Sequence, residues 1–250
     1  MFRRQVLASF SFATLLLATR ALAGPPYVTD DPEPVPFRNW EFYVAGTRAT
    51  DGNDRTGDAP HFEVNYGAAP RLQLHLIVPL SFSRPGGGST AFGLGDIEVG
   101  AKYRFVEESE GRPQIGTFPL VELPTGDATR GLGAGYVRAF LPVWLQKSFG
   151  RWTTYGGGGY WRNPGAGNRN WWFAGGQAQV QVTPSFAPGA EVYYQSPSEE
   201  GGRSEVRFNA GFVLDLGEHH HLLFSAGRAI HGCNCNQAYL AYLLTLGRKP

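Results

Sequence analysis

The chain has 250 residues, and its 22 Lys and Arg nearly balance its 21 Asp and Glu, leaving a net charge of +1. Such a balance gives no electrostatic case for a nucleic-acid partner. Two cysteines, Cys233 and Cys235, are too few for a disulfide scaffold or a metal centre. We therefore expect no nucleic-acid partner, no metal and no cofactor.

Residues 1–23 have the layout of a signal peptide. Arg3 and Arg4 form a basic start, an apolar stretch runs from Val6 to Ala18, and Ala-Leu-Ala at 21–23 is a small-residue cleavage site. The alternative is a membrane anchor, but the apolar stretch is short for a transmembrane span. We expect export and a mature chain that starts near Gly24.

Residues 24–39, GPPYVTDDPEPVPFRN, are rich in proline and acidic. Proline on this scale prevents a helix or a central strand. One interpretation is a plug inside a barrel, with Asp30, Asp31 and Glu33 facing luminal arginines, namely Arg104, Arg138 or Arg207. The other is a disordered tail on the periplasmic side.

Residues 40–247 alternate between apolar and polar side chains in segments that turn residues separate, and no segment repeats helical spacing convincingly. Most segments have roughly the 9–11 residues that a tilted membrane strand needs. Residues 248–250 are assigned to a C-terminal tail. The predicted strands are 40–49, 60–67, 71–83, 94–107, 114–125, 136–148, 151–162, 171–183, 186–196, 204–216, 221–231 and 238–247.

The connections between these strands alternate in length. Short turns at one end and long polar loops at the other are typical of outer-membrane barrels. An even number of strands then puts both ends of the chain on the short-turn, periplasmic side. The predicted short turns are 68–71, 109–113, 149–151, 183–185 and 217–220; the long loops are 51–59, 84–93, 126–135, 163–170, 196–203 and 232–237.

The segment GDIEVGAKYRF at 95–105 shows the two faces of one strand. Ile97, Val99, Ala101, Tyr103 and Phe105 alternate with polar neighbours, and a soluble barrel would turn this apolar face inward. Long strands, unbroken apolar rows and aromatic residues near strand ends favour a lipid-facing apolar exterior instead. We predict an all-β fold, a closed antiparallel transmembrane β-barrel of about twelve strands with a polar lumen. The aromatic residues assigned to its interfaces are Trp40, Phe82, Phe105, Phe149, Trp152, Tyr160, Trp161, Trp171 and Trp172.

The opposite faces of the strands carry charges of both signs into the predicted lumen. Isolated buried charges are costly, so we expect these groups to pair. Pairing by itself indicates a structural network, and a polar lining for a solute is compatible with it. The predicted lumen-lining charges are Glu41, Glu63, Asp96, Glu98, Lys102, Arg104, Glu122, Arg138, Glu191, Glu205 and Arg207.

Other residues that carry chemistry favour no catalytic site. The three histidines at 219–221 are interpreted as turn residues, because adjacent side chains rarely converge on one ion. Cys233 and Cys235 are expected as free thiols or a labile disulfide. Arg228 shares a face with Leu222 and Phe224, which a bulge or a rim position would explain. No G-x-S-x-G motif occurs, and His75 is predicted to face the lumen, so we predict no enzyme.

Three segments resemble a known family: GPPYVTDDPEPVPFRNWEFY after the signal, GLGDIEVGAKYRF and PLVELPTGD. They are similar to outer-membrane transporters of the phenol-degradation, MetA-pathway type. The resemblance covers essentially the whole mature chain and implies uptake of aromatic or other hydrophobic compounds.

We therefore predict an outer-membrane channel for passive passage of small, hydrophobic or aromatic solutes, located in a Gram-negative bacterium. Its expected partners are outer-membrane lipid, an unidentified small solute and the barrel assembly machinery. The alternatives are a non-conducting structural or surface-interaction barrel and, less favoured, a lipid-modifying barrel enzyme.

Overall fold

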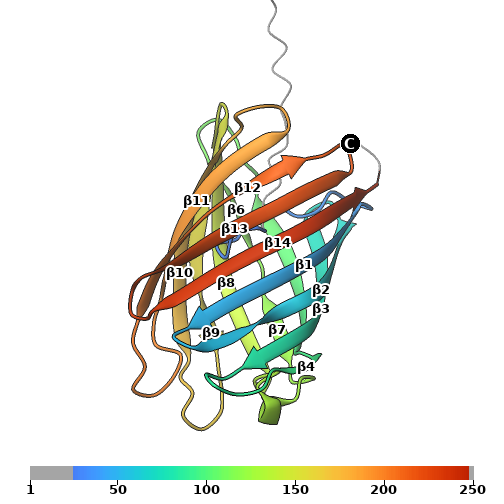
Figure 1. Cartoon of the computed structure of the whole chain (residues 1–250). Coiled ribbons are helices and arrows are strands. Elements are labelled where there is room, and N and C mark those ends of the chain that lie inside the picture. The colour runs from blue at the N-terminus through green and yellow to red at the C-terminus, as the bar shows by residue number, and fades with distance from the viewer. Residues whose placement is uncertain (1–24, 248–250) are drawn as a thin grey trace, which may run out of the picture.

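A computed structural model describes residues 25–247 of the chain. They form a closed antiparallel β-barrel with twelve strand positions in its wall, which confirms the predicted fold class (Figure 1). Within the described residues, no helix is long and apolar enough to cross a bilayer. The predicted signal peptide at 1–23 and the tail at 248–250 lie outside the described residues.

The wall follows chain order, and its first and last strands pair to close it. Trp40 is opposite Leu246 and Asp51 is opposite Cys235, so the β1–β14 seam is continuous along both strands. Two positions in the wall are each shared by two strands: the short β4 with the longer β5, and the short β6 with the short β7. The strands are β1 (Trp40–Asp51), β2 (Asp54–Ala69), β3 (Leu72–Arg84), β4 (Ala91–Leu94), β5 (Ile97–Val106), β6 (Gln114–Thr117), β7 (Leu120–Leu123), β8 (Arg138–Phe149), β9 (Trp152–Arg162), β10 (Trp171–Val180), β11 (Phe186–Gln195), β12 (Glu205–Asp215), β13 (His220–His231) and β14 (Cys235–Leu246).

The start of β1 and the end of β14 lie at the end of the barrel that carries the short turns, at the top of Figure 1. The long loops and a short 3-10 helix, η1 (Ala128–Arg130), lie at the opposite end. One predicted long loop, 51–59, is wrong: β1 and β2 meet in a tight turn at Gly52 and Asn53. Gly52 has a φ of 56°, a left-handed conformation that suits such a turn.

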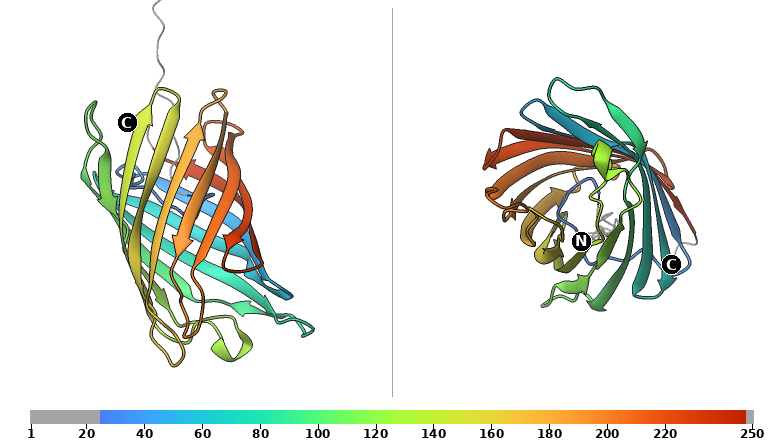
Figure 2. Two further views of the ribbon diagram at one scale, coloured as in Figure 1. Left: turned by 90° about the vertical axis from the view of Figure 1, so that its left-hand side faces the viewer. Right: turned by 90° about the horizontal axis from the view of Figure 1, so that it is seen from below.

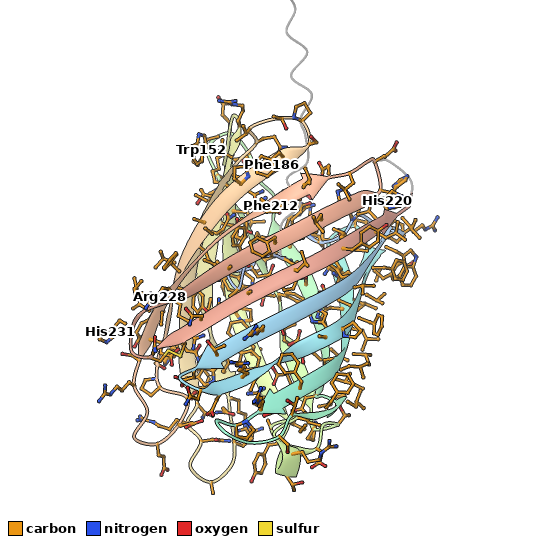
Figure 3. All side chains as sticks on the ribbon, in the orientation of Figure 1. Trp152, Phe186, Phe212, His220, Arg228 and His231 are labelled. Carbon is orange, nitrogen blue, oxygen red and sulfur yellow. A yellow bond between two sulfur atoms is a disulfide. The ribbon has the colours of Figure 1, made fainter. Side chains whose placement is uncertain are left out.

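The two faces of the strands separate apolar from polar side chains as the alternation predicts. On β5, Tyr103 and Phe105 are 45% and 44% exposed on the outside, whereas Lys102 is 3% exposed on the inside. Trp152, Phe186 and Phe212 project from the outer face of the barrel in Figure 3.

The aromatic assignment fails at two positions. Trp161 and Trp171 stack on each other on the inner face, because each lies an even number of residues from a buried neighbour on its strand, Tyr155 on β9 and Phe173 on β10.

Strand β13 resolves the phase of Arg228. The β12–β13 register shifts between the pairs Arg207–Ala229 and Val206–His231, so the bulge falls at Ile230, beyond Arg228. Arg228 therefore stays in phase with Leu222 and Phe224 and is exposed on the outer face (Figure 3). It sits three residues from the end of β13, where a charged side chain can extend away from the apolar band.

Candidate functional site

The segment 25–39 lies inside the barrel, as the view along its axis shows (Figure 2, right). Thr29 and Asp31 are 0% exposed and Pro32 is fully buried, although all three belong to a segment with no regular secondary structure. A polar segment can be buried this deeply only if its backbone and side-chain groups find partners. The lumen supplies such partners from two sides.

The acidic residues of the segment bind basic residues of β5. Lys102 Nζ lies 2.9 Å from Asp30 Oδ1 and 3.3 Å from Asp31 Oδ2. Arg104 Nη1 donates to both oxygens of Glu33 at 2.7 Å, and Gln114 Nε2 donates to the same carboxylate at 2.6 Å. Of the three arginines expected to face these carboxylates, Arg104 does so.

Arg138 and Arg207 do not contact the segment. They pair instead with Glu122 and Glu205. For Arg138 the reason is register, because Glu122 is directly opposite it on the neighbouring strand. Arg207 has Glu205 two residues before it, on the same face of its own strand.

Backbone groups of the segment bind the opposite wall. The amides of Val28 and Thr29 donate to the two oxygens of Glu191 at 2.9 and 2.7 Å. Asn209 Nδ2 donates to the same carboxylate at 2.5 Å, and Ser225 Oγ donates to the Pro26 carbonyl at 2.5 Å. Glu191 was predicted as a luminal charge, and here it accepts from two amides that have no strand partner.

Glycines in the wall leave room for the segment. A Cβ at Gly175 would lie closer than 3.0 Å to Thr29 Oγ1, a distance that real side chains do not tolerate. A Cβ at Gly189 would lie 2.7 Å from the Tyr27 hydroxyl, and one at Gly116 would lie 2.9 Å from Pro32 Cβ. Larger residues at these positions would therefore push against the segment.

Asp30 and Asp31 differ in how they hold the Lys102 ammonium. Burial works to raise the pKa of Asp30, but the charge and hydrogen bond of Lys102 outweigh it and set this pKa below its usual range. Burial raises the pKa of Asp31 well above its usual range, with the Lys102 charge opposing the rise. Asp30 is therefore the carboxylate that carries the charge of this cluster.

A second polar group lies beside the first, on the inner faces of β1, β2, β3 and β5. His75 Nδ1 is 2.7 Å from Asn65 Oδ1, and its Nε2 is 3.0 Å from Glu98 Oε1. Asn65 Nδ2 donates to Glu63 at 2.8 Å, and Glu41 accepts from the Tyr43 hydroxyl at 3.0 Å. Three predicted luminal acids, Glu41, Glu63 and Glu98, are joined through Asn65, which also donates to Glu41 at 3.5 Å, and through His75.

Asp96 lies at the break between β4 and β5 and binds a loop. Its two oxygens accept from the Gly126 amide at 2.9 Å and the Ala134 amide at 2.6 Å. The loop 124–137 that contains η1 is thereby held over the long-loop mouth of the barrel (Figure 2, right). Leu132 of this loop is 4% exposed.

Part of the inner wall is aromatic, which the alternation argument missed. Phe140 stacks on Trp161 with ring centroids 4.9 Å apart, and Trp161 stacks on Trp171 at 5.3 Å. Phe173 and Tyr193 continue this surface at 5.4 Å. The signal was present in the inward positions of 138–144, where Phe140 and Trp144 alternate with Leu141 and Val143, so that both faces are apolar.

Two cavities flank the segment. The larger, about 1200 Å³, is lined by residues of the short-turn end together with Asp30, Glu33 and Lys102. The smaller, about 420 Å³, lies beneath the loop with Leu132. Tyr27 lines both cavities, so the segment separates them.

The remaining motifs of the sequence do not contact the segment through any hydrogen bond of the described residues, although His219 and His221 line the larger cavity. Cys233 and Cys235 form a disulfide in the β13–β14 turn. The three histidines do not converge: His220 Nδ1 lies 2.5 Å from the Tyr242 hydroxyl, whereas His221 Nδ1 lies 2.7 Å from Asp215 Oδ1. His220 and His221 thus point to opposite faces of β13.

No protein-family description and no curated protein sequence matches this chain. Solved structures do match it in fold. The COG4313 outer membrane channel from Pseudomonas putida F1 has a TM-score of 0.66 and 17% identity, over 86% of this chain and 98% of that chain. The KdgM porin in complex with disordered oligogalacturonate has a TM-score of 0.56 and 8% identity, over 82% of this chain and 99% of that chain.

The NanC porin is similar to the same degree, with a TM-score of 0.56 and 8% identity over 82% of this chain and 100% of that chain. These three structures are outer-membrane channels and porins rather than enzymes. At such low identity the likeness shows the fold, which is that of an outer-membrane barrel.

Proposed function

We propose that the protein is an outer-membrane channel of a Gram-negative bacterium, for passive passage of small hydrophobic or aromatic solutes, with residues 25–36 acting as a plug. The observation that carries the proposal is the burial of this acidic segment between two cavities, bound to Lys102 and Arg104 on one side and Glu191 on the other. The fold shared with channels and porins supports it.

In this mechanism the segment moves out of its bound position in the lumen, here called the seated state. Its departure joins the two cavities into one path. The bonds to Lys102 and Glu191 that hold it are charge-assisted hydrogen bonds, each worth about 1.5–3 kcal/mol, so the seated state dominates at rest. The segment is continuous with β1, and the Arg38 amide donates to the Gly67 carbonyl at 2.7 Å. This bond fixes the chain at Arg38, which acts as the hinge, while residues 25–36 move.

The solute class follows from the wall that the path exposes. The aromatic surface of Phe140, Trp161, Trp171, Phe173 and Tyr193 offers planar apolar area for a hydrophobic or aromatic solute. Arg138 and Arg207 stay paired with Glu122 and Glu205 when the segment leaves, so this part of the lumen offers little net field for an ion. The phenol-degradation type of family resemblance points to the same solute class.

The test compares three proteins in planar bilayers and in solute-loaded vesicles: the full mature chain, a deletion of residues 25–36, and a Gly-Ser replacement of the same length. We expect both altered proteins to conduct more ions and to release an aromatic solute faster than the full chain. The replacement controls for chain length, because it keeps the hinge and loses the contacts. If none of the three proteins passes ions or solute, the channel proposal fails.

The second candidate is a structural or surface-interaction barrel that conducts nothing. The observation in its favour is the pairing of the luminal charges, which by itself stabilises a narrow barrel. This candidate predicts that none of the three proteins passes ions or solute in the same experiment, while heat-modifiable gel migration shows that all three are folded.

A further inference from the structure

We propose that three arginines on the outer face of the barrel, Arg48, Arg55 and Arg84, bind the phosphates of a lipid headgroup. The arginine cluster that they form lies at the long-loop end of β1, β2 and β3, three neighbouring strands that lie side by side in Figure 1. The inference goes beyond the proposed channel function, because a barrel that conducts nothing can carry the same site. It rests on the membrane placement of the barrel.

The strand register places two of these arginines on the outer face. Arg228, which is exposed on that face in Figure 3, is opposite Asn236 of β14, and Asn236 is opposite Thr50 of β1. Thr50 is opposite Arg55, and Arg55 is opposite Arg84. Residues that are directly opposite one another on neighbouring strands share one face, so Arg55 and Arg84 lie outside the barrel.

Arg48 joins this pair from β1. It precedes Thr50 by two residues and follows Val44, which is 49% exposed, by four, so the alternation puts all three on the outer face. Arg48 is the diagonal neighbour of Arg55 across the Thr50–Arg55 pair, and such neighbours lie about 7–8 Å apart. The three guanidinium groups can therefore reach a common ligand.

The charge of the cluster is not balanced within the protein. Among residues 25–247, no ion pair joins any of the three arginines to a carboxylate. The acidic neighbour of Arg55 on β2 is Asp54, which accepts instead from the Gly86 amide at 2.6 Å. Like charges directly opposite each other destabilise a sheet, so the Arg55–Arg84 pair favours an anion that binds to both.

Cations at the short-turn end of the barrel are arranged differently. Arg71 Nε lies 3.1 Å from Glu107 Oε1, and Lys147 Nζ lies 3.1 Å from Glu108 Oε1. Each of these two cations therefore has an acidic partner close by. The pairing that neutralises their charge is missing at the arginine cluster.

The chemistry of the cluster fits phosphate, and its place fits a lipid. Guanidinium groups bind phosphate oxygens through paired, charge-assisted hydrogen bonds. Phe82 is the outward residue that precedes Arg84 on β3, and the exposed Val44 precedes Arg48 on β1. The cluster therefore borders the apolar band of the barrel, so a lipid can lay its acyl chains against the wall with its headgroup beside the arginines.

The test measures the affinity of the purified mature chain in detergent micelles for diphosphoryl lipid A, by native mass spectrometry. The salt is about 0.15 M ammonium acetate, in which charges more than about 8 Å away are largely screened. We expect the double variant Arg55→Gln, Arg84→Gln to bind this lipid about tenfold more weakly, because two charged hydrogen-bond donors are lost. Heat-modifiable gel migration shows whether each variant is folded.

The control variant is Arg71→Gln, Arg151→Gln, which removes the same charge from exposed positions at the short-turn end. We expect it to bind diphosphoryl lipid A as the unaltered chain does. Equal losses in the control and in Arg55→Gln, Arg84→Gln would overturn the proposal, and so would unchanged binding in the latter.

Two further probes need no substitution. Lipid A from which the phosphates have been removed should bind the unaltered chain about tenfold more weakly than the diphosphoryl form. Inorganic pyrophosphate should show no binding at the lipid concentrations used, because it has no acyl chains to bury against the apolar band. Equal binding of the two forms of lipid A would overturn the phosphate site, and pyrophosphate that binds as tightly as the lipid would overturn the assignment to a lipid.

Discussion

The buried segment is held in different ways by two walls of the lumen. On β5, Lys102 and Arg104 hold it by charge, with ion pairs at 2.9 and 2.7 Å. On β10 and β11, Gly175 and Gly189 hold it by close approach, with Glu191 as the one charged contact. The charged wall, with Lys102 and Arg104, determines how strongly the segment is bound. The glycine wall, with Gly175 and Gly189, determines whether the segment fits. The two contributions can therefore be removed separately.

The largest effect is expected from removing the charge that two carboxylates share. Lys102→Met leaves Asp30 and Asp31 buried without their cation, which costs about 3–5 kcal/mol of seating free energy. The measurement is maleimide labelling of a cysteine placed at Thr29, which is 0% exposed. We expect labelling to accelerate about a hundredfold or more.

Lys147→Met is the control for Lys102→Met, because Lys147 binds Glu108 at the short-turn end, away from the segment. The native cysteines are bonded to each other and do not compete for the label. Equal labelling in the two variants would show that charge does not hold the segment.

The next effect tests the glycine wall. Gly175→Val places a side chain where Thr29 lies, and such overpacking costs about 1–3 kcal/mol. We expect a raised open probability in single-channel recordings, with the charged wall intact. Gly176→Val is a matched control, since no atom lies within 4 Å of a Cβ at this outward position. If the Gly175→Val channel stays closed, the ion pairs alone hold the segment and the close approach at Gly175 does not contribute.

A smaller effect separates the two aspartates. Lys102 sets the pKa of Asp30 below its usual range, so Asp30 is charged when the segment is seated. Burial raises the pKa of Asp31, so a neutral side chain is tolerated at that position. Asp30→Asn is expected to weaken seating by about 1.5 kcal/mol, and Asp31→Asn by less. The labelling assay at Thr29 compares them directly, and a reversed order would contradict the assignment of charge.

The same shift fixes the sign of a pH dependence. A carboxyl whose pKa is lowered in the seated state stabilises that state at neutral pH, and the contribution is lost as pH falls through the lowered pKa. Asp31, whose pKa is raised in the seated state, contributes with the opposite sign. In Asp31→Asn, which removes this opposing contribution, labelling at Thr29 should therefore rise on acidification, and it should change less when Asp30→Asn is added.

The smallest effect concerns the outer part of the segment. Glu33 is 40% exposed, so its pair with Arg104 is screened by water. Arg104→Gln is expected to weaken seating by under about 1 kcal/mol, a few-fold in the labelling rate at Thr29. A loss as large as that of Lys102→Met would show that Glu33 is shielded from solvent.

The sequence predicted the barrel well, because period-two alternation is a local signal. Strand 171–183, for example, was placed within three residues of its observed ends, Trp171 and Val180. The inward aromatic surface was missed, since alternation fails where both faces are apolar, as in 138–144. The partner of Arg138 was also missed, because it depends on register between strands, which one strand's pattern does not contain. The Glu205–Arg207 pair lies on one face of a single strand, so the alternation contained this signal.

The predicted long loop at 51–59 failed for a related reason. Its Gly and Asp residues indicate a loop, but most of them belong to β2, and two bulges between β2 and its neighbours accommodate the following Pro60 within the wall. Polar composition in this case reflects a strand that extends beyond the apolar band.

The β1–β14 seam has a consequence for the order of assembly. The strand made last pairs along its whole length with the strand made first, so the wall cannot close until β14 has been delivered. Residues 25–39 precede β1 and have been synthesised long before that moment. The lumen that holds them therefore exists in full only once the seam is closed.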